Sequence, residues 1–224
     1  MQSTAEPLVE NDFSSSVDTN RFRRARFSVF LKLVGAAAAN GRTVRILDIG
    51  GTQAYWQGLR PLWGNLPLEI TLINLGAPEY EVPPYISRAG DACDLSQFPD
   101  MAFDIVHSNS VIEHVGQWTQ TCAMAKEVRR LAPHYFVQTP NLWFPMEPHY
   151  RTLFFALYPA SVRAQMLTRR RRGFRGPFQE FSEAMMDVET VNLLDARGMR
   201  QLFPDGRLVR ERFFGLTKSL TMVR

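Results

Sequence analysis

Apolar and polar positions along the chain form blocks that predict helices and strands in turn. Between residues 27 and 34 the large apolar side chains recur at helical spacing, and Asn40 with Gly41 then offers a helix stop. Residues 44–49 are short, apolar and followed by two glycines. They predict a buried strand that ends in a glycine turn.

The same alternation continues to residue 139. Apolar runs predict further strands at 68–75, 85–89, 103–108 and 135–139. A helix is predicted before Pro133, with one apolar face formed by Trp118, Cys122, Ala125 and Val128. Strands that are apolar nearly throughout and separated by helices are typical of a parallel sheet covered on both faces.

The last third of the chain has a different pattern. A helix is predicted over 195–203, followed by strand-like runs at 207–213 and 216–223 around Gly215. So short a connection requires antiparallel pairing. The pattern therefore predicts an α/β fold with a mostly parallel seven-stranded sheet, a C-terminal antiparallel hairpin, and helices on both faces.

Composition indicates one globular domain. The chain has 224 residues, of which 45% are hydrophobic and 21% charged, an ordinary globular balance. Residues 1–18 are polar, contain a serine run and lack periodicity, so they predict a flexible N-terminal tail. Residues 19–224 are expected to form a single domain, with an aromatic and basic insertion at about 141–190.

The charge and the cysteine content indicate which partners and which cellular compartment to expect. The formal net charge is +4, and arginines gather in residues 21–26 and again in 163–175. Such clusters attract phosphates or an anionic membrane surface, although a solvated face is the alternative. The longest apolar run, 27–39, is too short to span a membrane and contains Lys32, and it is not expected to be a signal peptide. With only two cysteines, a soluble cytoplasmic protein is expected.

Polar residues follow the predicted strands at the places where they end. Asp48 to Thr52 follow the first strand, Asn74 ends the second, Gly90 to Leu95 precede the fourth, and Ser108 to Val115 follow it. In an open parallel sheet, ligands bind beyond the carboxyl ends of the strands. The ligand site is therefore expected along this edge.

Two of these segments carry a family resemblance. The run VRILDIGG and the run GDACDLSQFPDMAFDIVHSNSVIEHV resemble motifs of the class I S-adenosylmethionine-dependent methyltransferases, most closely the type 11 methyltransferase-like group. The resemblance covers roughly residues 25–224. It implies a Rossmann-like class I methyltransferase fold with S-adenosylmethionine as cofactor. The implied activity is transfer of a methyl group to a small-molecule, saccharide or lipid-linked acceptor, and O-methylation is expected.

The resemblance also implies roles for individual residues. Gly50 and Gly51 would form the turn beneath the methionine part of the cofactor, and Asp48 would position its amino group or a water. Asn74 would hold the ribose hydroxyls. The remaining residues would meet the adenine or line the floor near the sulfonium, and they are Asp91, Ala92, Ser108 and Asn109.

The sequence departs from the family pattern at three positions. Thr52 and Ala54 stand where the second and third glycines of the usual D-x-G-x-G-x-G spacing would be, and Asn74 replaces an acidic residue. A non-catalytic binding protein with a methyltransferase-like fold is therefore one alternative. A nicotinamide-dependent Rossmann oxidoreductase fits less well, because G-x-G-x-x-G is absent and the closing hairpin is unexplained.

Four histidines are candidates for the base that a hydroxyl acceptor requires. His107 lies within a predicted strand and is expected in the core, and His134 is expected at the surface. His114 and His149 are predicted to face the cleft and serve as catalytic residues, with a helix start and a packed aromatic lid as their structural alternatives. In quinone-biosynthesis O-methyltransferases a similar E-x-x-EH segment binds a divalent metal, but here Ser110 replaces the first glutamate, so no metal is expected.

The sequence leaves several classes of acceptor and partner open. Trp143, Phe144 and Tyr150 would wall a pocket suited to a sugar face, a quinone or phenol ring, or a lipid stem. The arginines 169–172 suit a phosphate or peripheral contact with an anionic membrane surface. No nucleic acid partner is expected, since no recognition motif accompanies the charge.

Overall fold

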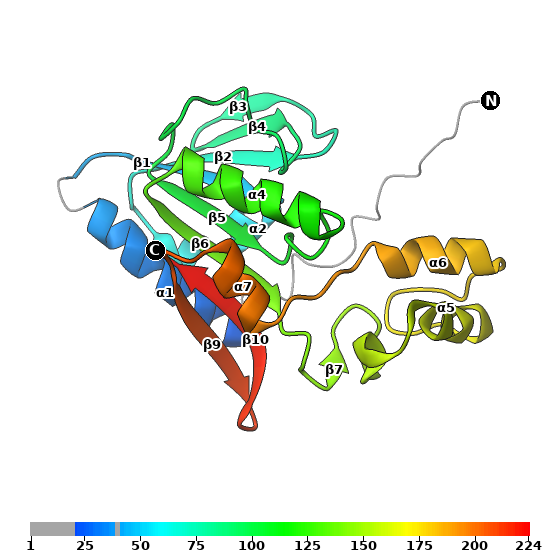
Figure 1. The fold of residues 1–224 in the computed structure, drawn as a ribbon. Helices are drawn as coiled ribbons and strands as arrows, with labels where there is room; N and C mark the ends of the chain where they lie inside the picture. Colours follow the sequence, from blue (N-terminus) through cyan, green and yellow to red (C-terminus); the bar gives the residue numbers. More distant parts are fainter. Residues whose placement is uncertain (1–20, 39–40) are drawn as a thin grey trace, which may run out of the picture.

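A large twisted sheet covered by helices on both faces forms the body of the protein, and a lobe of helices with a two-stranded sheet lies beside it (Figure 1). A computed structural model describes residues 21–38 and 41–224, so the predicted tail 1–18 lies outside the described residues. The sheet has eight strands in the order β3-β4-β2-β1-β5-β6-β10-β9. Their bounds are β1 Val44–Ile49, β2 Leu68–Asn74, β3 Tyr80–Val82, β4 Tyr85–Ala89, β5 Ile105–Asn109, β6 His134–Pro140, β9 Arg207–Phe213 and β10 Leu216–Val223.

Strand direction follows the sequence prediction. The neighbouring strands from β4 to β6 are parallel, and β10 pairs antiparallel with both β6 and β9. The α/β class and the C-terminal antiparallel hairpin are therefore confirmed. The count of seven strands is wrong by one, because the edge strand β3 pairs antiparallel with β4. β3 has three residues, two of them exposed, and so small a segment carries no readable alternation.

Helices cover the sheet on both sides, as the sequence predicts. Side chains alternate across β1, so that Ile46 faces one apolar core and Leu47 the other. α1, α2 and α3 pack on the Ile46 side, and α4 and α7 on the Leu47 side. Their bounds are α1 Arg21–Ala37, α2 Gln53–Gly58, α3 Arg60–Trp63, α4 Trp118–Leu131 and α7 Ala196–Leu202. No helix in the described part of the chain is long and apolar enough to cross a membrane.

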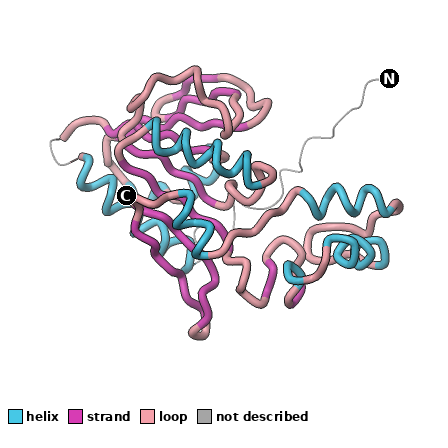
Figure 2. Tube along the Cα trace, in the orientation of Figure 1, coloured by secondary structure: helices cyan, strands magenta, loops and turns pink. Residues whose placement is uncertain are grey.

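The segment between β6 and α7 forms a small lobe of its own (Figure 2). Its elements are β7 Met146–Glu147, β8 Thr152–Leu153, the 3-10 helix η1 Phe155–Leu157, α5 Ala160–Arg169 and α6 Phe181–Glu189. They enclose a third apolar cluster, made of Tyr150, Phe155, Ala164, Leu167, Ala184, Val188 and Val191. Buried Asp187 accepts a hydrogen bond from the Tyr150 hydroxyl and pairs with Arg175 at 2.7 Å. The Tyr150 contact ties the loop 146–151 to α6.

Candidate functional site

The site begins at the glycine turn after β1. Gly50 has a φ of +76°, and a Cβ there would lie 2.3 Å from Cγ2 of Val111. A Cβ on Gly51 would lie 1.8 Å from the Oδ2 atom of Asp48. Both positions therefore require glycine.

Asp48 is the buried anchor of this turn. Its Oδ1 accepts a hydrogen bond from Nδ1 of His107 over 2.7 Å, and its Oδ2 accepts one from the indole N–H of Trp56 over 2.7 Å. His107 is 1% exposed and stacks on Phe136, which confirms its predicted place in the core. Asp48 is thus held by two neighbours.

The departures from the family pattern have local structural reasons. The side-chain amide of Asn74 donates a hydrogen bond to the carbonyl oxygen of Gly51 over 2.7 Å. A carboxylate at this position could not donate. Thr52 caps α2, since its hydroxyl accepts a hydrogen bond from the backbone N–H of Tyr55.

A cavity of about 760 Å³ opens at the carboxyl ends of β1 and β5. Its size is within the range of small-molecule and cofactor sites. Five of the predicted site residues line it, namely Asp48, Gly50, Gly51, Asn109 and His149. The glycine turn and the loop of the small lobe therefore face one shared cavity, as a site for a cofactor and an acceptor requires.

The other predicted cofactor residues do not line this cavity. Asp91 is exposed in a turn, where its Oδ1 accepts a hydrogen bond from the N–H of Cys93 over 2.9 Å. Ala92 packs against the core cluster around β5. Ser108 is fully buried, and its hydroxyl has no hydrogen-bond partner among the described residues. These residues and Asn74 border the neighbouring strand ends and not the cavity.

Residues from distant parts of the chain complete the cavity wall. Arg151 places its guanidinium 4.4 Å from the ring centre of Phe174, and both residues line the cavity. Arg23 of α1 and Lys218 of β10 add two further cations. The sequence placed Arg23 in a basic cluster but did not assign Arg151, Phe174 or Lys218 to the site, because these residues come together only through the packing of the lobe and the hairpin.

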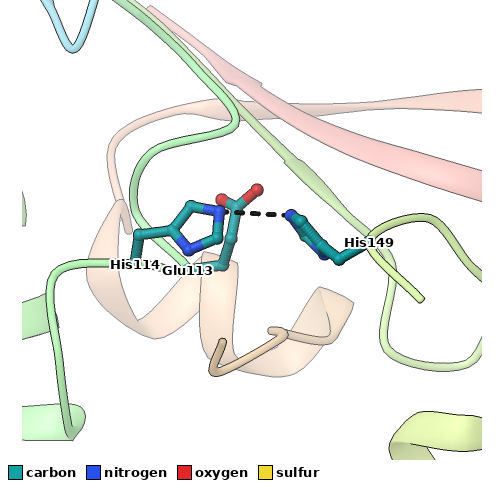
Figure 3. Close-up of side chains that lie close together, drawn as sticks. All are labelled: Glu113, His114 and His149. Carbon is teal, nitrogen blue, oxygen red and sulfur yellow. Dashed lines mark hydrogen bonds between the residues drawn. The ribbon is translucent and has the colours of Figure 1, made fainter. Parts of the chain in front are cut away.

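His114 and His149 are in contact, although they are 35 positions apart (Figure 3). Their Nε2 atoms are 3.1 Å apart, and the two rings are perpendicular. Nδ1 of His149 lies 2.6 Å from Oε1 of Glu147, and Nδ1 of His114 lies 3.0 Å from the carbonyl oxygen of Thr190. Each ring is therefore oriented through its Nδ1 atom.

Glu113 lies beside the two imidazoles and is fully buried (Figure 3). Its Oε2 accepts a hydrogen bond from the hydroxyl of Thr139 over 3.0 Å, while its Oε1 has no hydrogen-bond partner among the described residues. Burial raises the pKa of this carboxyl to about 7. Desolvation, followed by the charge of His149, lowers the pKa of His114. The sequence indicated His114 and His149 as candidates, but no pattern in it could place the Thr190 carbonyl that orients His114.

Comparison with known proteins agrees with this geometry. Residues 70–133 match a family model described as a methyltransferase domain. That segment runs from β2 to the end of α4 and contains the predicted motifs around Asp91 and His114. No curated protein matches the chain.

Solved structures share the fold at low sequence identity. The carbon methyltransferase CurJ is 12% identical with a TM-score of 0.56, over 95% of this chain and 57% of that one. An S-adenosylmethionine-dependent methyltransferase from Mesorhizobium loti is 12% identical with a TM-score of 0.54, over 92% and 98% of the two chains. The CMeT domain of citrinin polyketide synthase is 11% identical with a TM-score of 0.55, over 93% and 53%. This chain thus spans little more than half the length of two of these neighbours.

The cofactor predicted from the sequence is consistent with this match, since the methyltransferase domain implies S-adenosylmethionine. The large mostly parallel sheet, the closing antiparallel hairpin and the matched segment point to one conclusion. The predicted resemblance is confirmed: the chain has the class I S-adenosylmethionine-dependent methyltransferase fold.

Proposed function

We propose that this protein transfers a methyl group from S-adenosylmethionine to an acceptor bound in the cavity between the glycine turn and the loop 146–151. One observation carries the proposal: Gly50, Gly51 and His149 line the same cavity of about 760 Å³. The sulfonium end of the cofactor would lie at the glycines. The acceptor would enter from the side of His149.

The cofactor would extend along the sheet edge from the cavity. Its methionine part would lie over Gly50 and Gly51, near Asp48 and Asn109. Its ribose and adenine would reach the ends of β2 and β4, where Asn74, Asp91 and Ala92 stand. Ser108 supports the floor from inside the core. The order of these strands in the sheet supports this path, since β2 lies between β1 and β4.

The acceptor is a small molecule, a saccharide or a lipid-linked molecule that carries an anionic group. Arg23, Arg151 and Lys218 line the cavity and supply positive charge to its wall. Phe174, Met146 and Pro148 line it as well and offer apolar surface for a ring or a chain. Anions and flat apolar groups are the ligands that such a wall binds.

The proposed reaction is O-methylation. The acceptor oxygen forms a bond to the methyl carbon, the bond between that carbon and sulfur breaks, and its electron pair stays on the sulfur. The hydroxyl proton must leave during this displacement. His149 and His114 are the catalytic residues of the proposal, because His149 lines the cavity and contacts His114 through its Nε2 atom. A closely held acceptor lowers the barrier further.

A peripheral contact with an anionic membrane surface would supply a lipid-linked acceptor. Arg169, Arg170 and Arg171 are exposed at the end of α5, and Arg172 is partly buried next to them. Charges of this kind attract anionic headgroups from within about one Debye length. The lobe that carries them also carries the loop 146–151.

Direct measurement of methyl uptake tests the proposal. The full chain would be incubated with methyl-labelled S-adenosylmethionine and with saccharides, phenols and lipid-linked acceptors, each with and without a phosphate or carboxylate. Label should pass to an oxygen of an anionic acceptor. A chain that binds S-adenosylmethionine but methylates none of these would favour the non-catalytic binding protein. Label found on carbon or nitrogen would overturn O-methylation.

A further inference from the structure

The hydrogen bonds around the histidine pair determine which ring nitrogens carry protons. Nδ1 of His114 faces the carbonyl oxygen of Thr190, which only accepts, so this nitrogen carries the proton. Nδ1 of His149 faces the carboxylate of Glu147 and is the donor for the same reason. In their neutral forms, both rings therefore present a lone pair at Nε2.

These two lone pairs converge. The Nε2 atoms are 3.1 Å apart, which is a repulsive contact unless a proton or a cation lies between them. Two imidazole nitrogens that bind one tetrahedral zinc ion at 2.0–2.1 Å lie about 3.3 Å apart. The observed separation therefore already resembles that of two metal ligands.

A third donor stands next to the pair. The carboxylate of Glu113 is fully buried, and its Oε1 has no hydrogen-bond partner among the described residues. One ligand atom from each of Glu113, His114 and His149 lies within 4.8 Å of the other two. A small shift or a bridging water would bring the carboxylate to an ion. A proton shared by the imidazoles would leave this buried oxygen unsatisfied, which is costly.

The outer contacts have the arrangement found around metal-binding histidines. Such histidines almost always donate their second ring N–H to a carboxylate or a backbone carbonyl. Here Glu147 and the carbonyl of Thr190 fill those two roles. Both come from the segment between β6 and α7, so the small lobe orients the two histidines.

We propose that Glu113, His114 and His149 bind one divalent transition-metal ion of the zinc type. Two imidazoles and one carboxylate suit zinc, and three protein ligands leave a position open for another ligand. Since His149 lines the cavity, the open position would border the acceptor. There the ion, in place of a free imidazole base, would hold the acceptor oxygen and lower the pKa of its hydroxyl, with the proton passing to water. The proposal thus departs from the expectation, drawn from Ser110, that no metal binds. This role, but not the binding of the ion, rests on the proposed function.

The ligand set also predicts which ions bind. Magnesium prefers oxygen ligands in octahedral geometry, whereas two of the three donors here are nitrogens. The full chain, stripped with a chelator, would be titrated with Co²⁺ alone by visible absorption and with Zn²⁺ alone by calorimetry. One equivalent of each should bind, with the intense d–d bands of a four-coordinate Co²⁺ centre. Excess Mg²⁺ should displace neither.

Variants identify the ligands. His149→Ala and Glu113→Gln should abolish the Co²⁺ bands, and Glu147→Gln should weaken Zn²⁺ binding by about 10–100-fold. His134→Ala is the matched control, because His134 is an exposed histidine at the start of β6 and not one of the three proposed ligands, and the variant should bind both ions like the wild type. Far-ultraviolet circular dichroism would verify the fold of each variant. If buried Glu113→Gln fails to fold, the partly exposed His149 still gives the test.

Two results would overturn the inference: no stoichiometric binding by the wild type, or unchanged binding by folded His149→Ala. Calorimetry with S-adenosylmethionine on the same samples separates this inference from the proposed function. Metal binding without cofactor binding would reject the methyltransferase and keep the metal site. Cofactor binding without metal binding would reject the metal site and leave the proposed methyltransferase function standing.

Discussion

The side-chain amide of Asn74 donates a hydrogen bond to the carbonyl oxygen of Gly51 and so ties the end of β2 to the turn after β1. The family pattern usually has an acidic residue at this position, and the bond explains how an amide serves here. A carboxylate has no proton to donate and would repel the carbonyl.

The first prediction follows from this bond. Asn74→Asp should lower the free energy of unfolding by about 1–3 kcal/mol, because it replaces a partly buried hydrogen bond by a repulsive contact. It should also weaken S-adenosylmethionine binding by distorting the glycine turn. Urea denaturation and calorimetry measure the two effects. If Asn74→Asp has the wild-type free energy of unfolding and the wild-type cofactor affinity, the turn does not depend on the amide.

The glycine turn itself gives a second prediction. Gly51→Ala places a Cβ 1.8 Å from Oδ2 of Asp48, so the turn must shift, at a cost of about 1–3 kcal/mol. Gly35→Ala is the matched control, because Gly35 lies in α1 with no atom within 4 Å of the added Cβ. That change should stabilise the chain by about 0.5–1 kcal/mol. The midpoint of thermal unfolding should therefore fall in Gly51→Ala and rise in Gly35→Ala. A shift in the same direction in both variants would contradict the packing argument.

Much of the sheet could be predicted because buried strands have an unmistakable pattern. β1, β4, β9 and β10 have the predicted bounds, and each end of β2, β5 and β6 lies within two residues of its predicted position. β3 was missed because an edge strand of three residues buries no full face. Periodicity reports burial, so it fails where an element is mostly exposed.

The candidate site was predictable only in part, for a geometric reason. Polar residues at strand ends share one edge of the sheet, but adjacent strands are about 4.8 Å apart. β4 is two strands from β1, so Asp91 stands away from the cavity that Gly50 and Gly51 line. The contact of His114 with His149 depends on the folding of the small lobe, which no local pattern describes.

The third prediction concerns Asp91, which the resemblance assigns to the adenine. Asp91→Ala should weaken S-adenosylmethionine binding by roughly 10–100-fold, as expected for a lost hydrogen bond to a charged group. Asp94→Ala is the control, since Asp94 is an exposed aspartate in the same turn and accepts a similar backbone hydrogen bond from Ser96. Calorimetry compares the two. Equal losses would make Asp91 a turn residue without a cofactor contact.

The fourth prediction concerns the arginines at the end of α5. Changing the exposed Arg169, Arg170 and Arg171 to Gln should weaken binding to vesicles that contain anionic lipid, and should reduce the salt dependence of that binding. The control removes the same charge from β9 at three other exposed arginines, Arg207, Arg210 and Arg212. Vesicle sedimentation at two salt concentrations measures the difference. If both triple variants lose binding equally, net charge and not this cluster attracts the membrane.

The last prediction concerns His149, whose Nδ1 is held by Glu147 and whose Nε2 contacts His114. His149→Ala should lower the rate of methyl transfer about 100-fold or more. The acceptor hydroxyl loses the imidazole that removes its proton or that holds the ion lowering its pKa. S-adenosylmethionine affinity should stay unchanged, since the proposed cofactor contacts lie at the glycine turn and the strand ends. His134→Ala, at an exposed histidine, should have the wild-type rate. Single-turnover kinetics with cofactor calorimetry on the same samples measures both quantities. A near-normal rate in His149→Ala would remove this residue from the mechanism, whereas loss of cofactor binding would show that its loop supports the cavity structurally.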